Sequence, residues 1–354
     1  MITTFEGKRI AGVLGVLPET EYDFDEETKD FATPQTRRLK KIMGFNKRRA
    51  AKNTTTTTDL CEYGLKYLLD HKMVDTKEIG AIVVVSATPD YFIPHMSNII
   101  HGNFDFPQDV ICMDIAQGCA AYVLGIIQSC MLLEHLGDRK VLLFTGDVLC
   151  RKDPNVPLGR PSFGGDAASI TILENTNKDE KIYTNIYTDG KGRDALIMHA
   201  GGYRMPRTPE TAILRDIGDG TMAPLDEIWM HGSKVFNFVQ KDVPPMITEL
   251  VEYAGLTKED IDWYLFHQPN KFMVQKLAER LGVCKEKMPS NIVENFGNSS
   301  GSCVPINIAY NLGKQLLDEQ YLCCLSGFGS GLTWGAAITE LGHLDFCEYI
   351  ITDL

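Results

Sequence analysis

The sequence repeats one order of landmarks at a constant spacing of 181 residues, and this repetition restricts the fold more than any other feature. Four pairs of positions share the spacing: Thr76-Lys77-Glu78 with Thr257-Lys258-Glu259, the predicted strand ends Ser86 and His267, Cys119 with Ser300, and Thr145-Gly146 with Ser326-Gly327. One three-residue match would carry little weight, but four in one register indicate an internal duplication. We therefore expect two similar halves, at residues 1–175 and 176–354.

Each half is predicted to contain the same elements: strand, helix, strand, helix, strand, buried helix, strand, strand. Strands that alternate with helices are typical of a mixed, mostly parallel sheet with helices on its faces. Two such halves, stacked on each other, would enclose their central helices between two sheets. Residues 189–221 have no counterpart in the first half and are rich in Gly, Arg and Pro, so we expect them to form a cap over a site.

The most informative local pattern surrounds Cys119. Residues 110–115 predict a short buried strand, and residues 120–136 predict a long helix that is apolar on nearly every face and therefore buried. Cys119 lies at the joint beside Gly118, which lets the backbone turn sharply. A thiol at a helix N-terminus faces unpaired N–H groups and the positive end of the helix dipole, which stabilise a thiolate. The alternative is a small cysteine in the core, so partner residues must decide between the two.

Three segments of the second half are expected near Cys119: residues 266–270 at a strand end, residues 295–301 before the second central helix, and residues 327–331 between two strands. Open α/β sheets bind ligands at the carboxyl ends of their strands, so His267 and Asn298 are candidate partners of Cys119. Taken alone, such a histidine is more often structural and such an asparagine more often a turn residue. The glycine run at 327–331 precedes a strand, so it does not fit a dinucleotide site.

Composition excludes several classes of protein. The 354 residues are 44% hydrophobic and 23% charged, which is ordinary for a globular protein, and the net charge of −12 argues against general nucleic-acid binding. No window approaches the roughly 18 consecutive apolar residues of a membrane span. The first residues lack the basic and apolar parts of a signal peptide. Ten cysteines without a C-x-x-C pattern then favour reduced thiols in a cytoplasmic protein.

One segment runs against the acidic balance of the chain. Residues 33–52 are rich in Lys and Arg, whereas residues 22–30 just before them are strongly acidic. A basic cluster in an acidic protein is suited to phosphates or to an acidic partner. The alternative is a solvated helix face and loop.

Together these motifs resemble those of ketoacyl-acyl carrier protein synthase III, a family within the thiolase-like condensing enzymes. The matching patterns are Asp-x-Ala-x-x-Cys at 114–119, His-Gln-x-Asn at 267–270, Gly-Asn-x-Ser at 297–300, Gly-Phe-Gly-x-Gly-x-Thr-Trp-Gly at 327–335, and Gly165-Asp166. The resemblance covers nearly the whole chain. It implies a thiolase-like α/β fold, an internally duplicated five-layered αβαβα sandwich that forms a homodimer. It also implies a catalytic triad of Cys119, His267 and Asn298.

The resemblance further implies the reaction. An acyl group from acyl-coenzyme A or acyl-carrier protein is loaded on Cys119 and condensed with malonyl-acyl carrier protein, with loss of CO2. A thioester donor requires a soft nucleophile that can form and release an acyl-enzyme. The tetrahedral intermediate requires N–H donors, expected from Cys119 and from the turn formed by Gly329, Ser330 and Gly331. Coenzyme A or phosphopantetheine thioesters are then substrates, and neither a metal nor a redox cofactor is expected.

The expected substrate contacts depart from the family pattern. Arg38 stands where the family usually has a tryptophan that stacks on adenine, and Arg151 matches a nearby family arginine. Arginine can also stack on a flat ring. Ile93 replaces a phenylalanine that shapes the acyl pocket across the dimer, and Lys271-Phe272 departs from the basic residue often used to dock the carrier protein. Asn270 is a further expected substrate contact.

Two other functions stay open on the sequence. Cys119 could pass its acyl group to a hydroxyl, an amine or another acceptor in a specialised pathway. A non-catalytic subunit that only binds acyl thioesters is the alternative from another class, although such subunits usually lose the nucleophile. A hydroxymethylglutaryl-type synthase is disfavoured, because Thr88 stands where its extra glutamate would be and Asp90 is the nearest carboxylate.

Overall fold

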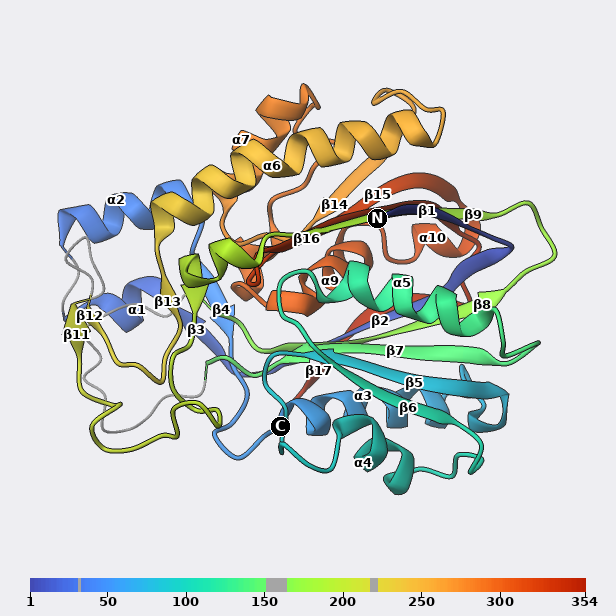
Figure 1. Ribbon diagram of the computed structural model, residues 1–354, viewed down its shortest axis with the longest axis horizontal. Coiled ribbons are helices and arrows are strands. Elements are labelled where there is room, and N and C mark those ends of the chain that lie inside the picture. Colours follow the sequence, from blue (N-terminus) through green and yellow to red (C-terminus); the bar gives the residue numbers. More distant parts are fainter. Residues whose placement is uncertain (31–32, 151–163, 217–221) are drawn as a thin grey trace.

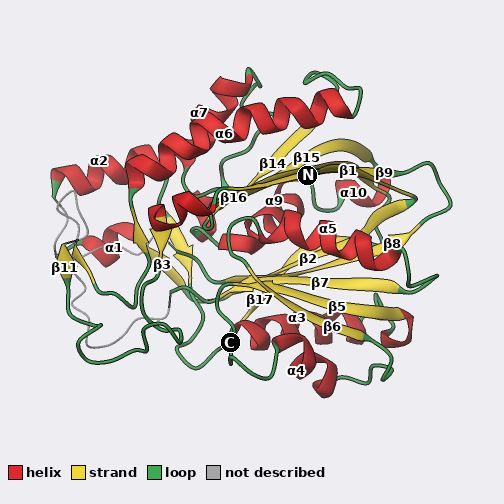
Figure 2. Cartoon of the chain, in the orientation of Figure 1, coloured by secondary structure: helices red, strands yellow, loops and turns green. Residues whose placement is uncertain are grey.

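The protein is represented by a computed structural model that describes residues 1–30, 33–150, 164–216 and 222–354, so Arg151 lies outside the described residues. Its strands form two large sheets, with helices above, between and below them (Figures 1 and 2). The first sheet has the order β17 (Phe346–Thr352), β2 (Lys8–Pro18), β8 (Ala167–Asn175), β7 (Lys140–Asp147), β5 (Ile79–Ser86), β6 (Ile111–Ala116). The second has the order β1 (Ile2–Glu6), β9 (Lys181–Thr188), β16 (Thr333–Gly342), β15 (Gln320–Gly329), β14 (Trp263–Phe266).

The two sheets repeat one strand order. The sequence β2-β8-β7-β5 of the first sheet corresponds to β9-β16-β15-β14 of the second, with the same directions between neighbours. This agreement supports the duplication predicted from the 181-residue spacing. The first and last strands of the chain each join the sheet of the other half. β1 pairs with β9 in the second sheet, and β17 pairs with β2 in the first. The boundary between residues 175 and 176 stays a prediction.

Helices complete five layers. The upper layer contains α6 (Gly232–Tyr253) and α7 (Lys271–Leu281), the central layer α5 (Ala121–Leu133), α9 (Cys303–Asn311) and α10 (Gln315–Asp318), and the lower layer α3 (Thr57–Asp70) and α4 (Met96–Asn103) (Figure 1). The predicted αβαβα sandwich is therefore confirmed. The remaining elements are β3 (Glu21–Asp23), α1 (Phe24–Thr28), α2 (Pro34–Met43), β4 (Lys47–Arg49), β10 (Leu196–Ile197), β11 (Arg215–Asp216), β12 (Met222–Ala223), β13 (Trp229–Met230), α8 (Ile292–Phe296) and the 3₁₀ turns η1 (Thr76–Glu78), η2 (Gly190–Ala195) and η3 (Ser300–Ser302).

The central helix α5 holds the layers together. Val123 and Ile126 belong to one hydrophobic cluster with Val83 and Leu143 of the first sheet and Leu325 of the second. Each fully buried aliphatic side chain of this kind contributes about 1.5–3 kcal/mol. The helix is buried as its apolar composition predicts, although it is shorter than the predicted 120–136.

Both sheets are mixed, as predicted. The first sheet is mostly parallel, because β17–β2, β7–β5 and β5–β6 are parallel pairs, whereas β2–β8 and β7–β8 are antiparallel. The second sheet is mostly antiparallel, contrary to the prediction, because β14–β15 is its one parallel pair among the described strands. One prediction about a single strand is also wrong. The strand predicted at 110–115 is not buried. It is β6, the edge strand of the first sheet, and Ile111 is 41% exposed. No described strand pairs with its outer edge.

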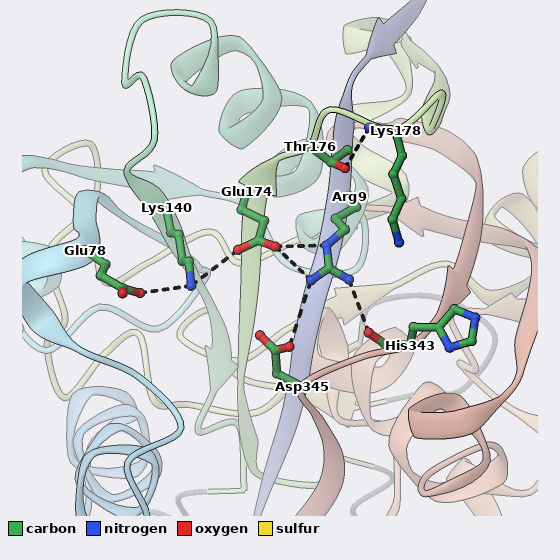
Figure 3. Close-up of polar contacts among 8 residues, drawn as sticks. All are labelled: Arg9, Glu78, Lys140, Glu174, Thr176, Lys178, His343 and Asp345. Carbon is green, nitrogen blue, oxygen red and sulfur yellow. Dashed lines mark hydrogen bonds and ion pairs between the residues drawn. The ribbon is translucent and has the colours of Figure 1, made fainter.

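A cluster of charged side chains joins β2, β7 and β8 of the first sheet to the segment that precedes β17 (Figure 3). Arg9 on β2 donates from Nε to Oε1 of Glu174 on β8 at 2.9 Å, and from Nη1 to the backbone oxygen of His343 at 3.2 Å. Nζ of Lys140 on β7 lies 3.4 Å from the other carboxylate oxygen of Glu174. Because Arg9 and Glu174 are largely shielded from water, their interaction is screened less than a surface pair.

We expect Arg9→Ala to lower the free energy of unfolding by about 2 kcal/mol, since it removes charge-assisted hydrogen bonds and leaves Glu174 with fewer partners. Urea denaturation measures the change. Lys66→Ala is the control, because Lys66 and Asp70 form an exposed pair whose loss should cost less than about 0.5 kcal/mol. Equal losses in the two variants would contradict a structural role for the Arg9 cluster.

Candidate active site

Cys119 lies in a tight turn between a strand and a helix, as predicted. Strand β6 ends at Ala116, and α5 begins at Ala121. The side-chain oxygen of Gln117 accepts the N–H of Gly118 at 2.9 Å, and the N–H of Ala121 donates to the oxygen of Gly118 at 2.7 Å. The Cys119 side chain is half-buried. Asp114, the first residue of the motif, does not contribute to the chemistry of this turn, because its carboxylate caps the start of α4.

The glycine-rich end of β15 packs directly on this turn. A Cβ on Gly329 would lie 2.5 Å from Cβ and 2.7 Å from Sγ of Cys119, and a Cβ on Gly327 would lie 2.7 Å from the backbone oxygen of Cys119. Only glycine permits such an approach. As a result, the backbone N–H groups of Ser330 and of Cys119 itself both lie close enough to the thiol to lower its pKa. Their role as hydrogen-bond donors to the thioester oxygen stays a prediction.

Burial acts against the thiolate that the helix terminus was expected to stabilise. Burial raises the pKa of the Cys119 thiol to about 11, and the negative charge of Asp147 adds to this. Hydrogen bonds from the Ser330 and Cys119 backbone and from the Ser300 hydroxyl act in the opposite direction with smaller effect. Cys119 is therefore a neutral thiol near pH 7, because desolvation outweighs the favourable helix terminus.

His267 follows the last residue of β14, and its backbone N–H donates to Ser326 at 2.8 Å. The ring is fully buried and lies edge-on to Phe328, with 5.7 Å between centroids. Neither ring nitrogen has a hydrogen bond of good geometry to a described residue, although the Ser300 backbone lies near the ring. Burial lowers the pKa of His267 to about 4, against a smaller opposing effect of the Ser300 backbone. The imidazole is therefore neutral at physiological pH and offers one N–H donor and one acceptor nitrogen.

The other two named members of the His-Gln-x-Asn motif, Gln268 and Asn270, form hydrogen bonds with backbone groups of neighbouring segments. The side-chain oxygen of Gln268 accepts the N–H of Ile292 at 2.9 Å, and its Nε2 donates to the oxygen of Pro289 at 2.8 Å. The side-chain oxygen of Asn270 accepts the N–H of Met273 at 2.8 Å and so caps α7. The role of Asn270 as a substrate contact stays a prediction.

Asn298 is placed by the turn that follows α8. Gly297 has a φ of +80°, and the oxygen of Asn298 accepts the N–H of Gly165 at 2.9 Å. The side-chain oxygen of Asn298 accepts the N–H of Ser300 at 3.0 Å. Its Nδ2 group has no partner in the described part of the chain, so a hydrogen-bond donor is left at the surface of the site.

Ser300 is the neighbour that the three predicted triad residues share. Its hydroxyl interacts with the thiol of Cys119, its backbone with the ring of His267, and its N–H with the side chain of Asn298. The structure therefore brings all three into one centre. Sequence reasoning gave Ser300 no role and missed Asp147, the fully buried last residue of β7. A carboxylate at the carboxyl end of an otherwise apolar strand was the signal available for Asp147.

The predicted substrate contacts lie apart from this centre. Ile93 is 81% exposed, and Arg38 is exposed on α2. No described contact joins either of them to the triad residues. Four cations of the basic segment form ion pairs with carboxylates that precede it in the chain. These ion pairs are Lys40–Asp25, Lys47–Glu21, Arg48–Glu27 and Arg49–Glu21. The role of the segment as a phosphate receptor stays a prediction. Among the described residues, Arg37, Arg38 and Lys41 have no ion-pair partner.

The insertion predicted as a cap begins beside the glycine-rich turn at residues 329–331. Asp189 and Leu332 exchange backbone hydrogen bonds of 2.9 and 3.0 Å, and Leu332 follows the glycine-rich turn. Further along, the ring of Tyr203 contacts the ring of Phe92, with centroids 5.4 Å apart. The described part of the insertion thus reaches from the site to the loop that carries Ile93. Its function as a cover stays a prediction.

Within residues 1–30, 33–150, 164–216 and 222–354, no group of His, Cys, Asp and Glu side chains is arranged to hold a metal ion. In the same residues, no helix combines the length and the apolar character needed to cross a membrane.

Comparison with known proteins agrees with this fold. Residues 251–341 match the family described as 3-oxoacyl-[acyl-carrier-protein (ACP)] synthase III C terminal. The chain is 30% identical over 336 residues to the beta-ketoacyl-[acyl-carrier-protein] synthase III of Clostridioides difficile, covering 93% of this chain and 98% of the relative. It is 28% identical over 347 residues to the enzyme of the same name from Caldanaerobacter subterraneus, covering 94% and 98%. The crystal structure of a 3-oxoacyl-(acyl-carrier protein) synthase from Burkholderia xenovorans matches with a TM-score of 0.90 at 30% identity, over 99% of both chains.

The fold and the cysteine-centred site define a thiolase-like condensing enzyme. The chain belongs to the beta-ketoacyl-acyl carrier protein synthase III family, and it is an acyl-transferring enzyme of that type.

We expect Gly329→Ala to lower the rate at which Cys119 is acylated by at least tenfold, because the added methyl group would overlap the thiol. Intact-protein mass after mixing with an acyl thioester measures this rate. Gly102→Ala is the matched control, since a Cβ there meets no atom within 4 Å. Unchanged acylation in Gly329→Ala would show that the turn at Cys119 is less tightly packed than described.

Proposed function

We propose that Cys119 accepts an acyl group from acyl-coenzyme A or acyl-carrier protein and that the acyl group is then condensed with malonyl-acyl carrier protein. One observation carries the proposal: a neutral, fully buried His267 and the donor amide of Asn298 share one centre with the cysteine. Neutral donors suit a thioester oxygen on which negative charge develops, whereas a protonated histidine would require a buried positive charge.

The first half-reaction uses the turn around Cys119. The sulfur attacks the thioester carbonyl, and the carbonyl oxygen becomes negatively charged in the tetrahedral intermediate. The N–H groups of Cys119 and Ser330 supply donors that are fixed before the reaction begins. Collapse of the intermediate releases the donor thiol and leaves the acyl group on Cys119.

The second half-reaction uses the other two triad residues. Loss of CO2 from a malonyl thioester leaves an enolate, and hydrogen bonds from His267 and Asn298 to its oxygen would stabilise it. The enolate carbon then attacks the acyl group on Cys119, and the sulfur leaves as the new carbon–carbon bond forms. This sequence consumes the carboxylate of the malonyl group and needs no oxidant.

Recognition of the donor is proposed for the three cations of α2 that have no ion-pair partner among the described residues, Arg37, Arg38 and Lys41. They are suited to the phosphates of coenzyme A or of a phosphopantetheine arm, and the guanidinium of Arg38 can stack on adenine. Arg151, the second arginine of this prediction, lies outside the described residues.

We also propose that the enzyme is a homodimer in the cytoplasm. The outer edge of β6 is unpaired among the described strands, and the nearby loop exposes Tyr91, Phe92 and Ile93 at 62%, 61% and 81%. An unpaired edge and an apolar loop are both unfavourable in water and are covered when a second copy pairs with them. The ten free cysteines are consistent with a reducing compartment.

The two half-reactions should separate by mutation. We expect His267→Ala and Asn298→Ala to accept an acyl group on Cys119 but to decarboxylate malonyl thioester more slowly by on the order of 10²–10³, because each loses one fixed donor. Cys119→Ala should show the reverse, with no acyl-enzyme but measurable decarboxylation. Protein mass and CO2 release measure the two steps, and His135→Ala, at an exposed histidine, is the control. If Asn298→Ala abolished acylation and left decarboxylation intact, these roles would be wrong.

Light scattering at micromolar concentration should give twice the chain mass of 39.5 kDa. We expect Ile111→Lys to shift the protein towards the monomer, because it places a charge on the exposed edge strand. Leu317→Lys, at a partly exposed position of α10 in the other half, should leave the dimer unchanged. A monomeric wild-type protein would contradict this interface.

A further inference from the structure

The acylation of Cys119 leaves one proton without an assigned acceptor. Because burial keeps Cys119 a neutral thiol, its proton must leave as the sulfur attacks the thioester. His267 is available, but taking the proton would create a positive charge on a fully buried ring. A buried carboxylate would instead lose its charge on accepting a proton, which is the favourable direction in a desolvated site.

Asp147 is such a carboxylate. It is fully buried at the carboxyl end of β7, beside the segment that follows β5. Its Oδ1 accepts the N–H of Ala87 at 2.8 Å, the hydroxyl of Ser86 at 3.1 Å and the hydroxyl of Thr88 at 3.3 Å. The Ser300 hydroxyl and the Gly301 N–H also lie near this carboxylate and lower its pKa, but neither forms a hydrogen bond of good geometry with Oδ2. Oδ2 is therefore less well satisfied than Oδ1, which is uncommon for a buried carboxylate oxygen.

Ser300 connects this oxygen to the nucleophile. Its hydroxyl oxygen lies 3.1 Å from the place where Gly118, the neighbour of Cys119, would carry a Cβ. The hydroxyl is also close enough to both Asp147 and Cys119 to lower the pKa of each. Ser300 has a φ of +50°, which residues with a side chain rarely adopt. The side-chain oxygen of Asn298 accepts the N–H of Ser300 at 3.0 Å. A strained backbone therefore keeps the hydroxyl between the two groups.

We propose that Asp147 accepts, through the Ser300 hydroxyl, the proton that Cys119 loses when it is acylated. This inference rests on the proposed function, which places the acyl group on Cys119. As Sγ bonds to the carbonyl carbon, the thiol proton moves to the oxygen of Ser300, and the proton of Ser300 moves to Oδ2 of Asp147. When the tetrahedral intermediate collapses, the carbon–sulfur bond of the donor breaks, and the leaving thiolate takes the proton back along the same path.

Loss of the Asp147 carboxylate should slow acylation of Cys119 but not decarboxylation of malonyl thioester. Decarboxylation of malonyl thioester requires no proton from Cys119, so it should not depend on Asp147. If the carboxylate only held Ser86, Ala87 and Thr88 in place, removing one of these hydrogen bonds should have the same effect as removing its charge.

The experiment measures acyl-enzyme formation by protein mass and CO2 release from malonyl thioester, in the full-length protein. Asp147→Asn keeps the size of the side chain and one acceptor oxygen, but it removes the basic carboxylate. We expect it to slow acylation by on the order of 10²–10⁴, the usual contribution of a positioned acid or base, and to leave decarboxylation close to that of the wild type.

Two further variants keep the test informative even if Asp147→Asn does not fold. Ser300→Ala removes the link but not the carboxylate, and it should also slow acylation selectively. Ser86→Ala is the matched control, because it removes one donor to Oδ1 and leaves Oδ2 and Ser300 in place. It should acylate close to the wild-type rate.

Unchanged acylation in Asp147→Asn or in Ser300→Ala would overturn the proposal. A parallel loss of both half-reactions in Asp147→Asn, reproduced by Ser86→Ala, would also overturn it in favour of a structural role. Slower acylation in His267→Ala than in Asp147→Asn would make the histidine the acceptor instead. Failure of the wild-type protein to form an acyl-enzyme would contradict the proposed function itself, which is a different result.

Discussion

The contact between the end of β15 and the turn at Cys119 is the constraint on which the site depends. Gly327 and Gly329 have no Cβ, so the second half of the chain reaches Cys119 and Ala120, just before α5, without displacing the nucleophile. The same approach brings the N–H of Ser330 to the thiol. Without it, the two halves would still stack through their hydrophobic cluster, but the donors from one half would not meet the sulfur from the other.

Burial then sets the protonation state of the whole centre. It raises the pKa of Cys119, lowers that of His267 and raises that of Asp147, so each group is pushed towards its neutral form. Neutral donors are suited to the decarboxylation step, whereas a neutral thiol is a poor nucleophile until its proton is removed. One physical cause therefore favours the second half-reaction and makes an acceptor necessary in the first.

Much of this arrangement was predictable from short patterns. The strand–turn–helix at Cys119 follows from an apolar strand, Gly118 and an apolar helix, and the position of His267 follows from a strand that ends just before it. The exposure of β6 was not predictable, because an apolar strand looks the same at the edge of a sheet as at its centre. The ion pairs of Lys40, Lys47 and Arg48 were also missed, since composition shows a basic and an acidic segment but not which side chains meet.

The sequence by itself determined the duplication, because four landmarks recur at one spacing along the chain. Its motifs also carry the resemblance that implied the five-layered fold and the triad of Cys119, His267 and Asn298. Only the tertiary structure decided that the thiol is neutral, that Ser300 touches all three residues and that the carboxylate of Asp147 lies beside them. Those properties depend on desolvation and on contacts such as those of Ser300 with Cys119 and Asp147, which come from opposite halves of the chain, and neither is written in any local stretch of the sequence.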